Sequence, residues 1–309
     1  MLTSSITAAY TQGARALSWP AQFRETPFRS AALEGLRQRN TMLDAAFYDV
    51  GVVTPTEASG IAPHLAAEGA ILLVPPTGEQ PLRLYRSVEA FVAECGDVRT
   101  LVVAGVGSSA LGTAAFARNV ADAVGEPVAG VVSGYGLADL ATEALGGFFW
   151  FGALNSIRHL YEPLDRATEA GHVAEPLPAV PSMLESRDTR AVVALLAHPG
   201  VRLERLVGHS KGNLVIAEAL FDLRAKERAC FDAVMKHLQV VTVSACVAMP
   251  KQCTNVLDVI GAWDGFGRFN SRLSIRPDHV VPRAWHHTNT ELPAHLPVTQ
   301  TLRDLLAAA

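Results

Sequence analysis

The chain has 309 residues, enough for one large α/β domain with an elaboration or for two modest domains. Hydrophobic residues make up 49% of the chain and charged residues 18%, below the roughly 25% of an ordinary soluble protein. A sizeable core is therefore easy to build, and the remaining apolar surface would suit a ligand, a lipid or a second copy of the chain. The net charge of -4, without a basic stripe, argues against a nucleic-acid partner.

The cysteines and the first residues point to the cytoplasm. The four cysteines form neither a C-x-x-C pair nor a dense framework, which is typical of reduced cytosolic thiols. Residues 1–7 lack both a basic region and a continuous apolar run, so no secretory signal is predicted. The apolar stretch 144–157 is bounded by Glu143 and Arg158 and is too short to span a bilayer. We therefore expect a cytoplasmic protein without a transmembrane segment.

In chain order, strands and helices alternate. Residues 1–45 are polar and partly helical in pattern, and we expect them to pack on the core. Apolar runs predict strands at 70–74, 82–85, 101–106, 128–132, 203–207, 240–247 and 256–261. Helical patterns lie between several of them, at 88–95, 111–124, 189–198 and 213–228. This alternation predicts an α/β fold with a mostly parallel sheet that is covered by helices on both faces.

The alternation is interrupted once, between the two parts of the predicted core, 46–133 and 188–309. Residues 134–187 are rich in glycine, alanine and aromatics and then in proline. We interpret this segment as a cap or lid inserted over the site. Its aromatic cluster, with Phe149 and Trp150, is expected to receive an acyl chain and to set chain-length preference. A cap helix that simply packs on the core would show the same pattern.

The sequence G-H-S-K-G at residues 208–212 is the most informative motif. An apolar strand leads into it and an apolar helical stretch leaves it, which is the context of a nucleophile elbow. Glycine fits at Gly208 and Gly212 because the turn is too sharp for side chains there. Ser210 would then stand above the sheet at a helix N-terminus, where backbone N–H groups can stabilise negative charge. An incidental serine in a strand-to-helix turn is the alternative.

With this elbow, the chain resembles the α/β-hydrolase fold family over residues 70–309. The resemblance implies a nucleophile, an acid and a histidine in that chain order. Asp264 follows the apolar run 256–261 and is expected just past the carboxyl end of a strand, where ligands collect in open α/β sheets. Asp258 lies inside that run and is the poorer candidate, and Asp264 as an ordinary turn aspartate before glycine is the alternative.

Two adjacent histidines, His286 and His287, compete for the role of base. Many members of the family carry Glu five residues and Pro seven residues after the histidine, and only His286 has Glu291 and Pro293 at that spacing. His287 is the alternate, and His295 ranks third because it lies so close to the final helix. His209 is expected to be a packing and hydrogen-bonding residue of the elbow.

The resemblance also implies an oxyanion hole of two backbone N–H groups. One would come from Lys211, the residue after the nucleophile. The second is expected from the glycine-rich loop after the strand 101–106, with Val106 as first choice and Gly107 as alternate. No cofactor or metal is expected, because the chain has no H-E-x-x-H motif and adjacent histidines point different ways on an extended backbone.

The same glycine-rich loop suggests nucleotide binding as an alternative. Residues 105–110 fit a relaxed dinucleotide fingerprint, but no acidic residue ends the next strand at 132–134. Residues 107–112 have the glycine spacing of a phosphate loop, but Thr113 stands where the lysine is required. Neither nucleotide pattern is complete.

The sequence therefore predicts a serine hydrolase that cleaves small-molecule carboxylic esters or lipids, of the esterase or lipase kind, through an acyl-enzyme. Two other functions stay open: a thioesterase or acyltransferase with the same triad, and a non-catalytic binding protein with this fold.

Overall fold

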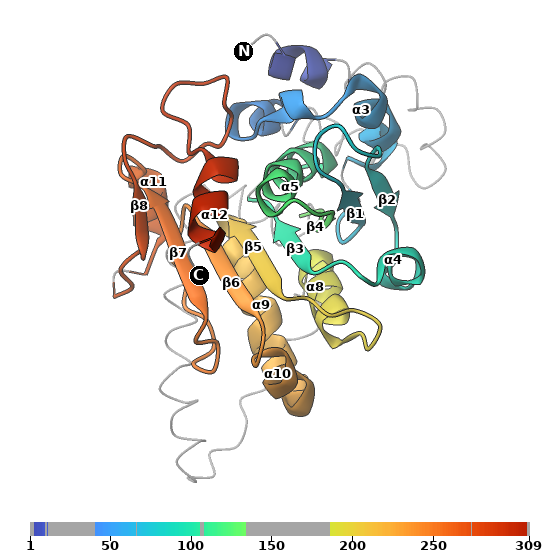
Figure 1. Cartoon of the computed structure of the whole chain (residues 1–309), viewed down its shortest axis with the longest axis vertical. Helices are drawn as coiled ribbons and strands as arrows, with labels where there is room; N and C mark the ends of the chain where they lie inside the picture. Colours follow the sequence, from blue (N-terminus) through green and yellow to red (C-terminus); the bar gives the residue numbers. More distant parts are fainter. Residues whose placement is uncertain are drawn as a thin grey trace, which may run out of the picture.

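The computed structural model describes residues 3–9, 11, 41–65, 67–105, 108–133, 186–272 and 274–307. These residues build an α/β fold around an eight-stranded sheet with the strand order β2-β1-β4-β3-β5-β6-β7-β8 (Figure 1). The strands are β1 (Ile71–Val74), β2 (Arg83–Tyr85), β3 (Thr100–Val103), β4 (Val128–Val131), β5 (Arg205–His209), β6 (Gln239–Val243), β7 (Val256–Gly261) and β8 (His279–Val281). The α-helices are α3 (Pro55–Ile61), α4 (Val88–Cys95), α5 (Ala110–Val124), α8 (Arg187–Ala197), α9 (Lys211–Lys226), α10 (Arg228–Val234), α11 (Gly265–Asn270) and α12 (Val298–Ala307), and the 3-10 helices are η2 (Val50–Val52) and η3 (Ala62–His64).

The sheet is mostly parallel, as the sequence predicts. Strands β4, β3, β5, β6, β7 and β8 run parallel to one another, and β1 pairs antiparallel with both β4 and β2. The carboxyl ends of β3, β5, β7 and β8 therefore meet at one edge of the sheet. In open α/β sheets this is the edge where ligands bind.

Helices cover both faces of the sheet (Figure 1). The core on one face includes α3, α5 and α12, and the core on the other includes α4, α8, α9 and α10. Successive residues of β3 alternate between the two, with Val102 in the first core and Leu101 and Val103 in the second. Because both faces are buried, the central strands are continuous apolar runs.

Local signals explain where several helices begin and end. Ser109 caps α5 by accepting a hydrogen bond from the Leu111 N–H, and Gly125 ends that helix with a φ of 73°. Helix α3 begins with a capping box in which Thr54 and Glu57 satisfy each other's backbone N–H groups. Such caps fix the helix ends that face the loops of the sheet.

Several predicted boundaries were wrong in detail. The expected strand 240–247 ends at Val243, because Ser244 turns the chain with a φ of 60°. The expected strand 101–106 ends at Val103. The single helix expected at 213–228 is two helices, α9 and α10, separated at Glu227, whose φ of -136° is not helical.

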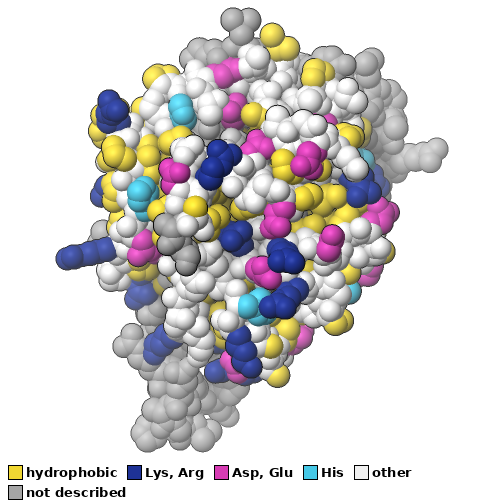
Figure 2. All heavy atoms as spheres, viewed as in Figure 1, with side chains coloured by type: hydrophobic (Ala, Val, Ile, Leu, Met, Phe, Trp, Pro, Cys, Tyr) yellow, Lys and Arg dark blue, Asp and Glu magenta, His cyan; other side chains and the backbone are white. Residues whose placement is uncertain are grey.

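The surface that Figure 2 shows carries acidic and basic side chains interspersed over the described residues, without a large patch of one sign. Among the helices that the structure describes, none combines the length and the apolar composition needed to cross a membrane. The cap expected at 134–187, with Phe149 and Trp150, lies outside the described residues except for its last two positions, and so does most of the segment 1–45.

Candidate active site

Ser210 occupies a sharp turn between β5 and α9. Its φ of 53° and ψ of -118° are strained for a residue with a side chain, and such strain is typical of functional positions. The backbone holds the turn in place, because the Ser210 N–H donates to the Val243 carbonyl over 2.9 Å. Ser210 stands directly before the first residue of α9, so the backbone N–H groups of the first turn of that helix lie close to it.

The two glycines of the motif are required by close packing. A Cβ on Gly212 would lie 2.1 Å from the carbonyl oxygen of Val103, and a Cβ on Gly208 would lie 2.2 Å from Oδ1 of Asn213. Asn213 itself donates to the Val243 and Ala245 carbonyls over 3.0 and 2.9 Å, which ties α9 to the loop after β6. At Gly208 and at Gly212, therefore, the neighbouring atoms leave no space for a methyl group.

Asp264 lies three residues beyond the end of β7 and is fully buried. Its Oδ1 accepts a hydrogen bond from the Gly267 N–H over 2.5 Å, so the same side chain also caps α11. A Cβ on Gly267 would lie 2.5 Å from Asp264 Oδ2. Glycine at this position therefore lets α11 begin directly against the carboxylate and fixes its orientation.

His286 bridges Asp264 and Ser210. Its Nδ1 lies 3.0 and 2.9 Å from the two Asp264 oxygens, and its Nε2 lies 3.1 Å from Ser210 Oγ. Because a carboxylate only accepts hydrogen bonds, Nδ1 carries the proton and Nε2 is left with a lone pair directed at the serine hydroxyl. The ring is buried and packs edge-on against Phe266, with centroids 4.8 Å apart.

The other candidate histidines do not reach Ser210. His287 Nε2 lies 3.1 Å from the Pro293 carbonyl, and the His287 ring packs against Trp285. His295 Nδ1 lies 3.1 Å from the Leu292 carbonyl. The structure thus brings Ser210 together with His286 and not with its neighbour.

The residues that distinguished His286 in the sequence have other contacts here. Glu291 accepts hydrogen bonds from the backbone N–H groups of Thr3 and Ser4 and so holds the helical residues 3–9 against the histidine loop. Pro293 offers its carbonyl to His287. Asp258, the poorer acid candidate, lies within β7 and accepts from the Thr242 hydroxyl, and burial raises its pKa to about 6.

A small, mostly apolar hollow opens beside the serine. Its lining consists of Ser210, Lys211, Leu214, Ala245, Val247, Phe266 and Asn270. Burial lowers the pKa of the Lys211 ammonium to about 8. A ligand whose carbon atom lay against Ser210 Oγ could place a small group attached to that carbon in this hollow.

The part of the loop after β3 that the structure describes lies against Ser210. A Cβ on Gly105 would lie 3.2 Å from Ser210 Cβ, so this backbone approaches Ser210 closely. The Gly105 N–H donates to the Tyr48 hydroxyl over 2.6 Å. The two residues predicted to supply the second oxyanion donor, Val106 and Gly107, lie outside the described residues.

Residues 41–48 contribute more than the sequence indicated. Asp44 is buried and accepts from both the N–H and the hydroxyl of Ser109, the residue that caps α5. Phe47 packs edge-on against His286 with ring centroids 5.9 Å apart. A short helical segment far from the motif residues in sequence therefore supports two loops of the site. No residue pattern in the sequence signals these contacts.

The described part of the chain contains no group of three or more His, Cys, Asp or Glu side chains suited to a metal ion. No family model, curated protein or solved structure matches this chain. The geometry of Ser210, His286 and Asp264 is therefore the main indication of what this chain does.

Proposed function

We propose that this protein is a serine hydrolase of the α/β-hydrolase fold that cleaves carboxylic esters through an acyl-enzyme. One observation carries the proposal: Ser210, His286 and Asp264 form a continuous series of hydrogen bonds at the carboxyl edge of a mostly parallel sheet. Their chain order and the strained elbow around Ser210 support the same conclusion.

The first half of the reaction follows from the proton positions. A serine hydroxyl is a weak nucleophile at neutral pH, so His286 Nε2 accepts its proton as Ser210 Oγ bonds to the ester carbonyl carbon. The ester carbonyl oxygen becomes an oxyanion, and the Lys211 N–H at the start of α9 is the donor proposed to stabilise it. Asp264 holds the imidazole in the required tautomer and stabilises the imidazolium.

The second half returns the enzyme to its starting state. As the oxyanion collapses, the bond from carbon to the alcohol oxygen breaks, and His286 gives its proton to the leaving alcohol. Water then attacks the acyl-enzyme with His286 as base, and the carboxylic acid leaves as Ser210 regains its proton. The hollow beside Ser210 is the proposed position of the acyl group.

Covalent labelling tests the proposal. A fluorophosphonate probe should label the native protein, and peptide mapping should place the label on Ser210. The Ser210→Ala variant should take no label and should lose nearly all hydrolysis of activated esters, while its circular dichroism spectrum stays unchanged. Retention of most esterase activity by a folded Ser210→Ala variant would overturn the proposal.

The choice of substrate decides between the remaining functions. A series of activated esters from acetyl to long-chain acyl measures whether esters are turned over and at what chain length. Acyl-CoA turnover that exceeds ester turnover would favour a thioesterase or acyltransferase. A labelled Ser210 without turnover of either class would favour a binding protein.

A further inference from the structure

A second hydrogen-bond series lies directly behind the catalytic one. His209 is buried beside Ser210, and its Nδ1 lies 2.9 Å from the Tyr48 hydroxyl while its Nε2 lies 3.0 Å from the backbone carbonyl of His286. The Tyr48 hydroxyl in turn accepts the Gly105 N–H over 2.6 Å. Four groups are thus joined that are far apart in the sequence.

Only one arrangement of protons satisfies this series with a neutral ring. The His286 carbonyl can only accept, so His209 Nε2 must carry the proton. His209 Nδ1 then has a lone pair and must accept from the Tyr48 hydroxyl, whose oxygen is left to accept from Gly105. Every donor and acceptor is used once, as expected of a buried polar network that orders its surroundings.

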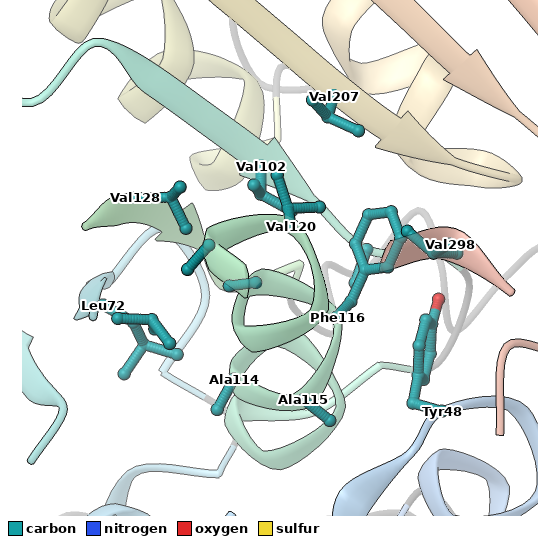
Figure 3. Packing of buried hydrophobic residues seen from close by; sticks show 14 of the residues in the cluster. Tyr48, Leu72, Val102, Ala114, Ala115, Phe116, Val120, Val128, Val207 and Val298 are labelled. Carbon is teal, nitrogen blue, oxygen red and sulfur yellow. The ribbon is translucent and has the colours of Figure 1, made fainter. Parts of the chain in front are cut away.

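The environment of His209 favours the neutral ring. Burial, and then the neighbouring His286, lower the pKa of His209 to about 3. The two imidazole rings have centroids 5.1 Å apart, and the His209 ring also lies 5.6 Å from that of Phe116. Figure 3 shows Tyr48 beside Phe116 within the buried apolar cluster. A positive charge on His209 would oppose the charge that His286 gains when it takes the serine proton.

The series connects the three loops that the proposed reaction needs. Gly105 follows β3 and approaches Ser210, His209 ends β5 and precedes the nucleophile, and His286 follows β8. A Cβ on Gly105 would lie 2.9 Å from the Tyr48 hydroxyl, so the backbone itself is held at this oxygen. Tyr48 comes from outside the sheet, contacts Gly105 and His209 directly, and is connected to the His286 carbonyl through His209.

We propose that Tyr48 and His209 are positioning residues, which hold the backbone of His286 and the loop at Gly105 in register with Ser210 by a neutral hydrogen-bond series. This inference rests on the proposed function, because it assigns these residues a role in the reaction of that same site. Neither residue touches the reacting atoms, so both act through the position of His286 and of the oxyanion loop.

The test compares four variants by steady-state hydrolysis of an activated ester. His209→Leu has a similar volume but cannot donate to the His286 carbonyl, and Tyr48→Phe leaves Gly105 and His209 without their shared hydroxyl. Each should lower kcat on the order of 10- to 100-fold, with KM within about threefold, because small displacements of reacting groups cost rates of this size. His209→Gln can still donate to the carbonyl and accept from Tyr48, and should restore kcat to within about fivefold of the native value.

Tyr85→Phe is the matched control. Its hydroxyl is also hydrogen-bonded, to Glu94 over 2.9 Å, but it lies in the core on the other face of the sheet. This variant should keep its kcat. Folded His209→Leu and Tyr48→Phe variants with kcat within threefold of native would overturn the inference and leave the proposed function intact. Equal losses in folded His209→Gln and His209→Leu would also overturn it, because loss of the aromatic ring, and not of its hydrogen bonds, would then explain the effect. Absence of labelling and hydrolysis in the native protein would instead refute the proposed function.

Discussion

The replacement Asp264→Asn is expected to inactivate the protein without unfolding it, for a reason that the geometry specifies. Asp264 Oδ1 accepts from the Gly267 N–H over 2.5 Å and lies 3.0 Å from His286 Nδ1, and Oδ2, which has no such backbone donor, lies 2.9 Å from the same nitrogen. In the variant, Gly267 still needs an acceptor, so the amide oxygen takes the place of Oδ1. The amide nitrogen then takes the place of Oδ2 and directs an N–H at His286 Nδ1.

This reversal disables the base. An N–H facing His286 Nδ1 is accommodated only when that nitrogen is unprotonated, so the proton of the neutral ring moves to Nε2. Nε2 then faces Ser210 Oγ as a donor and cannot accept its proton. The expected loss in kcat is on the order of 10^4-fold, or about 5.5 kcal/mol in the barrier. Because the cap on α11 survives, the free energy of unfolding should change by no more than about 1 kcal/mol.

The assay is hydrolysis of an activated ester, with stability measured by chemical denaturation. Asp258→Asn on the same stretch of chain is the matched control, since its partner is Thr242 and it does not contact His286. Its kcat should stay within about threefold of native. An Asp264→Asn variant that retains a tenth or more of the native kcat would refute the tautomer argument.

Three further predictions concern stability. Gly212→Ala should prevent stable folding, because its Cβ would lie 2.1 Å from the Val103 carbonyl oxygen, whereas Gly265→Ala meets nothing within 4 Å and should fold normally, as judged by thermal unfolding. Arg118→Met should lower the free energy of unfolding by about 3–5 kcal/mol in chemical denaturation, because it leaves the buried Glu57 carboxylate without the cation that lies 2.5 Å away. Arg83→Met removes one partner of an exposed pair with Glu94 and should cost at most about 1 kcal/mol, and similar losses of stability in the two variants would contradict this. Burial raises the pKa of Asp44 from 3.8 to about 7, so the folded state binds this proton more tightly than the unfolded state. The protonated Asp44 therefore contributes about 4 kcal/mol to stability below pH 4, and this contribution is lost as the pH rises through 7. Native stability should therefore fall relative to Asp44→Asn between pH 4 and pH 8, and parallel pH profiles would show that Asp44 does not titrate in this range.

The strand, sharp turn and helix around Ser210 could be predicted from the sequence because they depend on local geometry. A strand, a sharp turn and a helix each have their own residue signals, and the two glycines mark positions where no side chain fits. The positive φ of Ser210 and the contacts at Gly208 and Gly212 agree with that prediction. The alternation of strands and helices likewise indicated a mostly parallel sheet, since both depend on short-range periodicity.

The shortest elements and the antiparallel part of the sheet could not be predicted from the sequence. Strand β8 is three residues long and α11 is six, too short for periodicity to distinguish them from loops. The antiparallel pairing of β1 with β4 depends on strand partners that no local pattern identifies. Hydrogen bonds and apolar surface from neighbouring elements stabilise these short elements and this pairing, and no local pattern in the sequence shows those neighbours.

For the site, the sequence by itself determined the types of residues and their order along the chain. The spacing before Glu291 and Pro293 selected His286, and the structure has His286 beside Ser210, although Glu291 and Pro293 themselves contact other groups. Only the tertiary structure revealed the series from Gly105 through Tyr48 to His209, whose members are 57 and 161 residues apart. The Tyr48 hydroxyl, which hydrogen-bonds to Gly105 and to His209, gives no periodic pattern in a single sequence, because the packing of the whole sheet decides which groups lie next to it.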